Sequence, residues 1–260
     1  MGPFFILISG GFLAGTLGGL LGIGGGILIM PVLRFFVGLS PVYAAGTCIA
    51  PVFFTTLGGS IRHYKLGHIK IKSLIPVIIP GALSTIVFSI LFSHFTGKAT
   101  WLDLGTGLVF SLISIRMIID GSLDFLGKKV EQAAKTEMRG QLVEKITIGG
   151  LAGILPGFFG IGTGAVLVPA FTLVLKSPIK IAIGSSLACF SVNAFLSAAM
   201  KLQQGFVNTD VILPLCLGTF IGSYIGAKLN KRFPSPLLKV MFGVLFIYIA
   251  LKYFLLFSGR

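Results

Sequence analysis

Long apolar windows separated by short polar segments run along the whole chain. The windows cover residues 4–37, 42–60, 73–95, 101–119, 146–175, 181–200, 211–228 and 237–257. A helix of about 20 apolar residues can cross the ~30 Å hydrocarbon core of a bilayer, and several windows meet this length. The pattern therefore predicts an all-α polytopic membrane protein that crosses the bilayer several times.

Two of the windows, 4–37 and 146–175, are too long for one simple crossing. At 1.5 Å per residue, continuous helices would measure about 50 and 45 Å. Both windows carry glycine and proline near the middle, and these residues interrupt helices. We therefore expect each window to form a helix that breaks inside the membrane. The predicted breaks are Gly22–Gly26 with Pro31, and Gly160–Gly164 with Pro169.

The two broken windows are copies of each other. The stretch "GGLLGIGGGILIMPVL" at 18–33 aligns with "PGFFGIGTGAVLVPAF" at 156–171, an offset of 138 residues. The match continues into the following spans, where Gly46-Thr47 falls on Gly184-Ser185. A match of this extent indicates a duplication. The predicted organisation is a first transmembrane repeat at 1–120, a cytoplasmic linker at 121–145 and a second repeat at 146–260.

Basic residues indicate how the repeats lie in the membrane. Lys and Arg cluster in the loops 61–72, 176–180 and 228–239 and in the linker. Such residues stay on the cytoplasmic side. All four clusters share one side if each long window forms a re-entrant hairpin, whereas eight simple crossings divide them. We therefore expect two inverted repeats, each a broken re-entrant hairpin plus three transmembrane helices, with both termini outside the plasma (inner) membrane.

Composition excludes several classes of protein. The mean hydropathy is +1.00, and only 11% of the residues are charged, which is too few to cover a soluble fold. The net charge of +14 is explained by cytoplasmic loops and does not indicate a nucleic-acid partner. Cys48, Cys189 and Cys216 lie in apolar segments without a CxxC motif or a Cys/His cluster. We expect neither a metal site nor a cofactor.

Catalytic groups are not apparent in the predicted spans. The acidic residues lie in loops or at span ends, and there is no HExxH motif or carboxylate pair. We therefore expect no catalytic residues and no enzymatic activity. A proton relay usually needs an Asp, Glu or His within a span, so any ion coupling would use the substrate's proton or backbone and hydroxyl ligands. Lys201 stands alone between two windows, and His63 is expected at the membrane interface.

The breaks are candidates for binding an anion. The first turn of a returning half-helix carries free N–H groups and about half a positive charge, and two inverted repeats would bring two such ends together near the bilayer midplane. Glycines also allow tight helix packing, which Gly11, Gly15 and Gly19 fit well. The candidate substrate-binding residues of the breaks are Gly22, Gly24, Gly25, Gly26, Gly160, Gly162, Thr163 and Gly164. The following spans add Thr47, Thr55, Ser185 and Asn193, which serve either as interhelical contacts or as cavity lining.

The sequence resembles the TauE/SafE-type sulfite exporters over nearly its whole length apart from the linker. The resemblance rests on "GLLGIGGGILIMPVL" and its copy "GFFGIGTGAVLVPAF", and on the spans at 44–69 and 182–207. It implies a transporter of small sulfur-containing anions such as sulfite, thiosulfate or organosulfonates. Thr163 departs from the glycine pattern, and Cys48 stands where the second copy has Ser186.

The expected partners are therefore a small inorganic or organic sulfur anion and the lipid bilayer, and a homo-oligomer stays open. Two alternative functions remain. The protein is a permease for another small anion or an organic acid, or it is a non-transporting membrane subunit.

Overall fold

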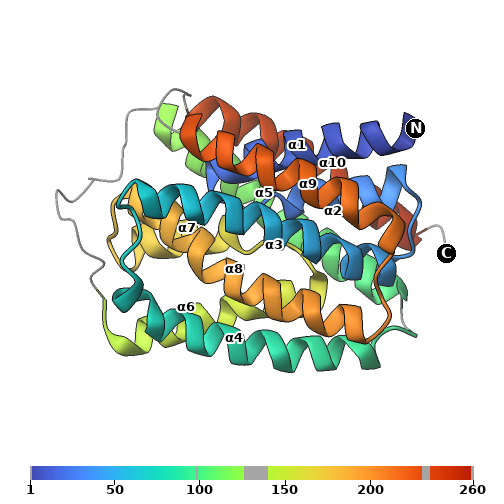
Figure 1. Cartoon of the computed structure of the whole chain (residues 1–260), viewed down its shortest axis with the longest axis horizontal. Coiled ribbons are helices and arrows are strands. Elements are labelled where there is room, and N and C mark those ends of the chain that lie inside the picture. Colours follow the sequence, from blue (N-terminus) through green and yellow to red (C-terminus); the bar gives the residue numbers. More distant parts are fainter. Residues whose placement is uncertain (1, 98, 126–139, 230–234, 259–260) are drawn as a thin grey trace.

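The computed structural model describes residues 2–97, 99–125, 140–229 and 235–258, which fold into a bundle of helices (Figure 1). Most of the predicted linker lies outside these residues. The first repeat contains α1 (Gly2–Leu21), α2 (Gly26–Pro31), the π-helical η1 (Val32–Phe36), α3 (Pro41–Lys65), α4 (Ile71–His94) and α5 (Ala99–Phe125). The second contains α6 (Leu142–Ile154), the π-helical η2 (Leu155–Phe159), α7 (Gly164–Leu173), α8 (Ile179–Gln203), α9 (Thr209–Leu229) and α10 (Ser235–Ser258).

The bundle has the surface of a membrane protein. Among the described residues, seven helices are long and apolar enough to cross a bilayer. Large apolar side chains such as Leu83, Leu112 and Leu213 are exposed on the outer faces of α4, α5 and α9. An apolar outer surface suits contact with lipid. The predicted all-α polytopic membrane fold is confirmed.

Helices that the repeat alignment makes equivalent run antiparallel to each other. At one end of α3, Gly46 lies against the Phe206 carbonyl just after α8, and at the other end His63 lies against Gly184 near the start of α8. The first hairpin has both ends toward the right of the bundle in Figure 1, and the second has both ends toward the left. An antiparallel relation between equivalent helices is what inverted repeats require.

The first broken helix packs along its length on a helix of the other repeat. Glycines at four-residue spacing on α1 lie directly against the backbone of α9, and glycines of α9 lie against α1 in return. Small residues at this spacing let two membrane helices approach closely. The residues involved are Gly11, Gly15 and Gly19 of α1 and Gly218, Gly222 and Gly226 of α9. The predicted packing role of the α1 glycines is confirmed.

The second broken helix makes the matching contact. Gly149 and Gly153 of α6 lie against Val77 and Gly81 of α4, and Gly157 of η2 lies against Thr85. The hydroxyl of Thr85 donates to the Gly153 carbonyl at 3.2 Å. Each repeat therefore supplies the packing surface for the broken helix of the other, and the two repeats are interlocked rather than side by side.

Candidate functional site

Both long windows break at the predicted glycines. Between α1 and α2, the backbone at Gly22, Gly24 and Gly25 has φ of 75°, 78° and 71°, a left-handed conformation that disfavours other residues. At the end of η2, Gly160 has φ of 66°. Four residues at each place, 22–25 and 160–163, leave the helix before the chain returns as α2 or α7. The predicted position of both breaks is confirmed.

The prolines expected at the breaks lie elsewhere. Pro31 is the last residue of α2, and Pro169 lies inside α7. A proline inside a helix removes one hydrogen bond, and the chain after Pro31 continues as the π-helical η1. The glycines therefore make the breaks, and the prolines modify the returning helices.

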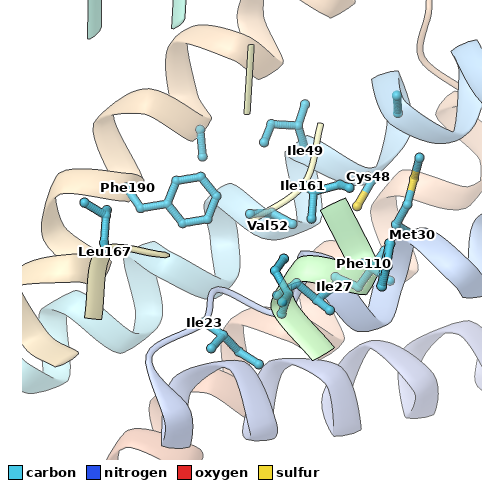
Figure 2. Packing of buried hydrophobic residues seen from close by; sticks show 14 of the residues in the cluster. Ile23, Ile27, Met30, Cys48, Ile49, Val52, Phe110, Ile161, Leu167 and Phe190 are labelled. Atoms are coloured by element: carbon cyan, nitrogen blue, oxygen red, sulfur yellow. The ribbon is translucent and has the colours of Figure 1, made fainter. Parts of the chain in front are cut away.

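The two breaks meet at the centre of the bundle. Gly26 lies against the backbone nitrogen of Gly162, and Gly164 lies against the Gly22 carbonyl and the Ile23 backbone. A β-carbon at Gly26, Gly162 or Gly164 would fall on backbone atoms of the other segment. Figure 2 shows the apolar side chains that pack around this contact, with Ile27, Val52 and Ile161 among them.

The contact brings the first turns of the two returning helices together. The continuous helical run 26–36 and α7 both start at the breaks, and neither has a hydrogen bond from a capping side chain. The first N–H groups of a helix have no acceptor within the helix. The Leu28 and Val166 N–H groups donate to the Gly25 and Thr163 carbonyls at 2.9 Å, so the N–H groups of the first two residues of each helix are left for a ligand. The helix dipoles favour a negative charge there.

Three of the predicted site residues have a buried polar atom without a partner. They are Thr163 at the start of α7 and Ser185 and Asn193 on α8, each no more than 2% exposed. The atoms are the two hydroxyl oxygens and the Asn193 Oδ1. Most buried polar atoms in proteins are hydrogen-bonded, so these exceptions suit a site that is completed by a ligand.

The equivalent polar residues of the first repeat already have hydrogen-bond partners within the protein. Thr47 accepts a hydrogen bond from the Asn208 N–H at 2.9 Å, and Thr55 donates to the Pro51 carbonyl at 2.9 Å within its own helix. Gly25, at the position of Thr163, has no side chain. The polar side-chain atoms left without partners at the predicted site therefore come from the second repeat.

Two further side chains reach the first break. The Cys48 thiol donates to the Gly26 carbonyl at 3.5 Å, and the Ser186 hydroxyl donates to the Gly22 carbonyl at 3.4 Å. These two residues occupy equivalent positions in the repeats. The departure from the repeat pattern at Cys48 therefore places a thiol beside the break.

The breaks are closely packed in this conformation. Two hollows of the described structure lie away from them, one beside Phe35 and Lys252 and one between Phe53 and Phe195. Thr163 is fully buried, and Phe190 lies against Gly24. A ligand at the breaks therefore requires the two segments to separate.

Two buried basic residues were missed by the sequence analysis. Lys201 was expected between two spans, but α8 continues to Gln203 and buries Lys201 completely. His63 was expected at the interface, but it is fully buried in α3. The two residues are 138 positions apart, so they occupy the same position in the two repeats.

A signal for both residues was present in the sequence. Thr47 and Thr55 are eight residues apart, and a further step of eight leads to His63. The same two steps from Ser185 lead to Asn193 and Lys201. Positions four and eight apart lie along one ridge of a helix. Extending the spacing by one step would have placed both bases on the buried ridge.

The profile of the family described as Sulfite exporter TauE/SafE matches residues 7–253. The chain belongs to the TauE/SafE sulfite exporter family. Two relatives from Bacillus subtilis are named as probable membrane transporter proteins, YunE and YjnA. YunE is 28% identical over 265 residues, which cover 95% of each chain. YjnA is 30% identical over 254 residues, 93% of this chain and 96% of its own.

A Haemophilus influenzae protein with the same description, probable membrane transporter protein, is 28% identical over 268 residues and covers 94% of this chain and 96% of its own. No solved structure matches the chain significantly. The family and the relatives identify a membrane transporter rather than an enzyme.

In this TauE/SafE protein, a buried ion pair fixes the end of the first hairpin that follows α2. Arg34 of η1 donates to both carboxylate oxygens of Asp103 in α5, at 3.0 and 2.8 Å, and to the Leu39 carbonyl at 3.1 Å. The two side chains are 10% and 2% exposed. Arg34 therefore ties η1, the turn at Leu39 and α5 together.

Replacing Asp103 by Asn is expected to destabilise the protein by about 3–5 kcal/mol, because it leaves the buried Arg34 without a counter-charge. The thermal unfolding temperature of the purified protein in detergent measures the effect. Asp120→Asn is the matched control. It removes a more exposed carboxylate 3.7 Å from Arg116, and its cost should stay below about 1 kcal/mol. Equal effects of the two substitutions would contradict the structural role of the Arg34–Asp103 pair.

Proposed function

We propose that this protein transports small sulfur-containing anions such as sulfite, thiosulfate or organosulfonates across the plasma membrane. The anion binds where the two glycine breaks meet, held by N–H groups at the starts of α2 and α7. The hydroxyls of Thr163 and Ser185 and the Asn193 side-chain amide complete the site. The observation that carries the proposal is the meeting of two helix starts without a side-chain cap, at one of which the buried hydroxyl of Thr163 has no hydrogen-bond partner.

The chemistry of the site suits an oxyanion. The two helix starts together supply about one positive charge without a buried salt bridge. Glycine at Gly25, Gly26 and Gly164 lets oxygen atoms approach the backbone N–H groups closely. Such a site neutralises an anion without binding it so tightly that it cannot leave.

Transport requires the contact between the two breaks to open alternately toward one side of the membrane and then toward the other. The site is closed in this conformation, because Gly26 lies against Gly162 and Gly164 against Gly22. The repeats are proposed to be inverted in the membrane, so that rocking of one hairpin opens the site outward and rocking of the other opens it inward. Both termini would lie outside, with the basic loops in the cytoplasm.

Uptake into proteoliposomes tests the proposal. The purified protein is expected to move sulfite, thiosulfate or sulfoacetate faster than protein-free liposomes, and faster than it moves sulfate or chloride. Movement of chloride or an organic acid alone would favour a permease for another anion. If no anion moved, the role of a non-transporting membrane subunit would replace the proposed function.

A further inference from the structure

Lys201 is a buried cation whose charge no carboxylate balances in the described structure. Its Nζ donates to the Pro156 carbonyl of η2 at 3.3 Å and lies 4.3 Å from the centre of the Phe92 ring. The side chain is completely buried. The salt bridges among the described residues involve Asp103 and Asp120, and neither reaches Lys201.

The surroundings of Lys201 contain few other ionisable groups. The titratable group that interacts with it electrostatically is the Cys48 thiol of α3. From α4 it meets the Phe92 ring, and from η2 it meets the Pro156 carbonyl, which also accepts a hydrogen bond from Ser197 at 2.6 Å. Lys201 thus donates to η2, which leads into the second break, and interacts with Cys48, which donates to Gly26 at the first break.

Lys201 also ends a continuous polar ridge along α8. The ridge consists of every fourth residue of α8 from 185 to 201. Each of these residues carries a polar side chain or a thiol, and each is at most 2% exposed. The ridge runs from Ser185 to Lys201, 17 residues with a rise of about 24 Å. Its members are Ser185, Cys189, Asn193, Ser197 and Lys201. Ser185 and Asn193, whose unpartnered atoms belong to the proposed anion site, lie on the same ridge as Lys201.

A lone ammonium group in this position is unfavourable. Burying a charge away from water is costly unless an opposite charge pairs with it, and an ionisable residue inside a membrane protein usually marks a functional site. One carbonyl and one aromatic ring replace only part of the lost hydration. Two states of Lys201 avoid the cost of burying an unpaired charge. Without a ligand the side chain is a neutral amine, and with an anion bound it is an ammonium paired with that anion.

We propose that Lys201 binds one proton each time an anion enters the site, and releases it when the anion leaves. The lone pair of the neutral amine takes a proton from a hydronium ion of the solution, whose O–H bond breaks to leave a water molecule. The resulting ammonium pairs with the anion. Binding of proton and anion is then mutually reinforcing. The protein would therefore carry the anion together with a proton. This inference rests on the proposed function, because it adds a proton-binding residue to the same site.

The equivalent base of the first repeat has a different environment. The Nδ1 atom of His63 lies 3.1 Å from Nδ1 of His68, so the two imidazoles form a pair. Arg62 lies beside His63 in sequence and over the Tyr224 ring. His63 thus has a basic side chain as its partner, whereas Lys201 has a carbonyl and a ring. The proposal therefore assigns the coupled proton to Lys201.

Proton uptake by the wild-type protein tests the inference directly. The full chain in detergent and weak buffer is titrated with thiosulfate, which has no titratable proton of its own near neutral pH. We expect uptake of about one proton per thiosulfate bound, and an affinity that falls about tenfold per pH unit once the free amine is neutral. Binding of thiosulfate without proton uptake would overturn the proposal.

Variants separate a proton-binding role from a structural one. Lys201→Met should lose both proton uptake and most thiosulfate binding. Lys201→Arg keeps a permanent charge, so it should bind thiosulfate without proton uptake and with an affinity that does not change between pH 6 and 8.5. Lys65→Met, which removes an exposed lysine at the end of α3, is the control and should behave as wild type. Wild-type proton uptake retained in folded Lys201→Met would also overturn the proposal.

The two levels of the proposal fail in different ways. If the reconstituted protein moves sulfur anions but their binding takes up no proton, the inference about Lys201 fails and the proposed function stands. If only chloride binds and takes up a proton through Lys201, the inference stands and the sulfur-anion assignment fails. If none of the tested anions binds, both fail.

Discussion

Replacing Thr163 by Val is expected to reduce the initial rate of sulfur-anion uptake by at least about tenfold while leaving the protein at least as stable as the wild type. The hydroxyl lies at the start of α7, fully buried and without a partner. Removing a polar group that is buried without a hydrogen bond avoids a cost of about 1–3 kcal/mol in the folded state. Removing a donor from a charge-stabilising site costs about tenfold or more in rate.

Measuring both the uptake rate and the unfolding temperature distinguishes a binding role of Thr163 from a structural one. A residue needed only for folding would lower the unfolding temperature and the uptake rate together. Thr172→Val is the matched control, because Thr172 lies in the same helix and its hydroxyl already donates to the Val168 and Pro169 carbonyls. Uptake by that variant should stay near the wild-type rate. Undiminished uptake by Thr163→Val would exclude its hydroxyl from the site.

Replacing Gly164 by Ala is expected to destabilise the protein by at least ~2 kcal/mol and to lower the yield of folded protein. The added methyl group would fall on the Gly22 carbonyl and the Ile23 Cα, which are backbone atoms of the other break. Backbone atoms cannot move aside as a flexible side chain can. The two breaks would have to separate, and the starts of α2 and α7 would lose their arrangement.

A second glycine provides the control for the Gly164 variant. Gly150 lies within α6 and has no atom within 4 Å of the position that a β-carbon would take. Gly150→Ala should therefore be neutral or stabilise the helix by about 0.5–1 kcal/mol. Unfolding temperature and the size-exclusion profile in detergent compare the two variants. A Gly164→Ala protein as stable as Gly150→Ala would mean that the breaks do not meet backbone to backbone.

The sequence predicted the fold well because a membrane imposes simple constraints. Apolar length located the spans, and the excess length of 4–37 and 146–175 located the breaks. The duplication supplied independent support at Gly22–Gly26 and Gly160–Gly164. The packing role of Gly15 and its neighbours followed from their spacing, although the partner helix α9 could not be read from the sequence.

The parts of the site that were missed depend on tertiary packing. Lys201 ends an apolar window and lies next to polar residues, a pattern that also fits a loop. Only the packing of η2 and Phe92 around the end of α8 buries it. Tertiary packing also explains why the Thr47 hydroxyl has a hydrogen-bond partner and the Ser185 hydroxyl has none. The Asn208 N–H that donates to Thr47 comes from the turn after α8.

The interlocking of the repeats has a consequence for the biogenesis of the protein. α1 is synthesised first, but α9, whose backbone its glycines contact, is among the last helices to leave the ribosome. At typical rates of synthesis, the delay between the two is on the order of tens of seconds. During this time the glycine face of α1 has no α9 to cover it. Final assembly must therefore follow completion of the chain, and the first half alone should be a substrate for membrane quality control rather than a stable folding unit.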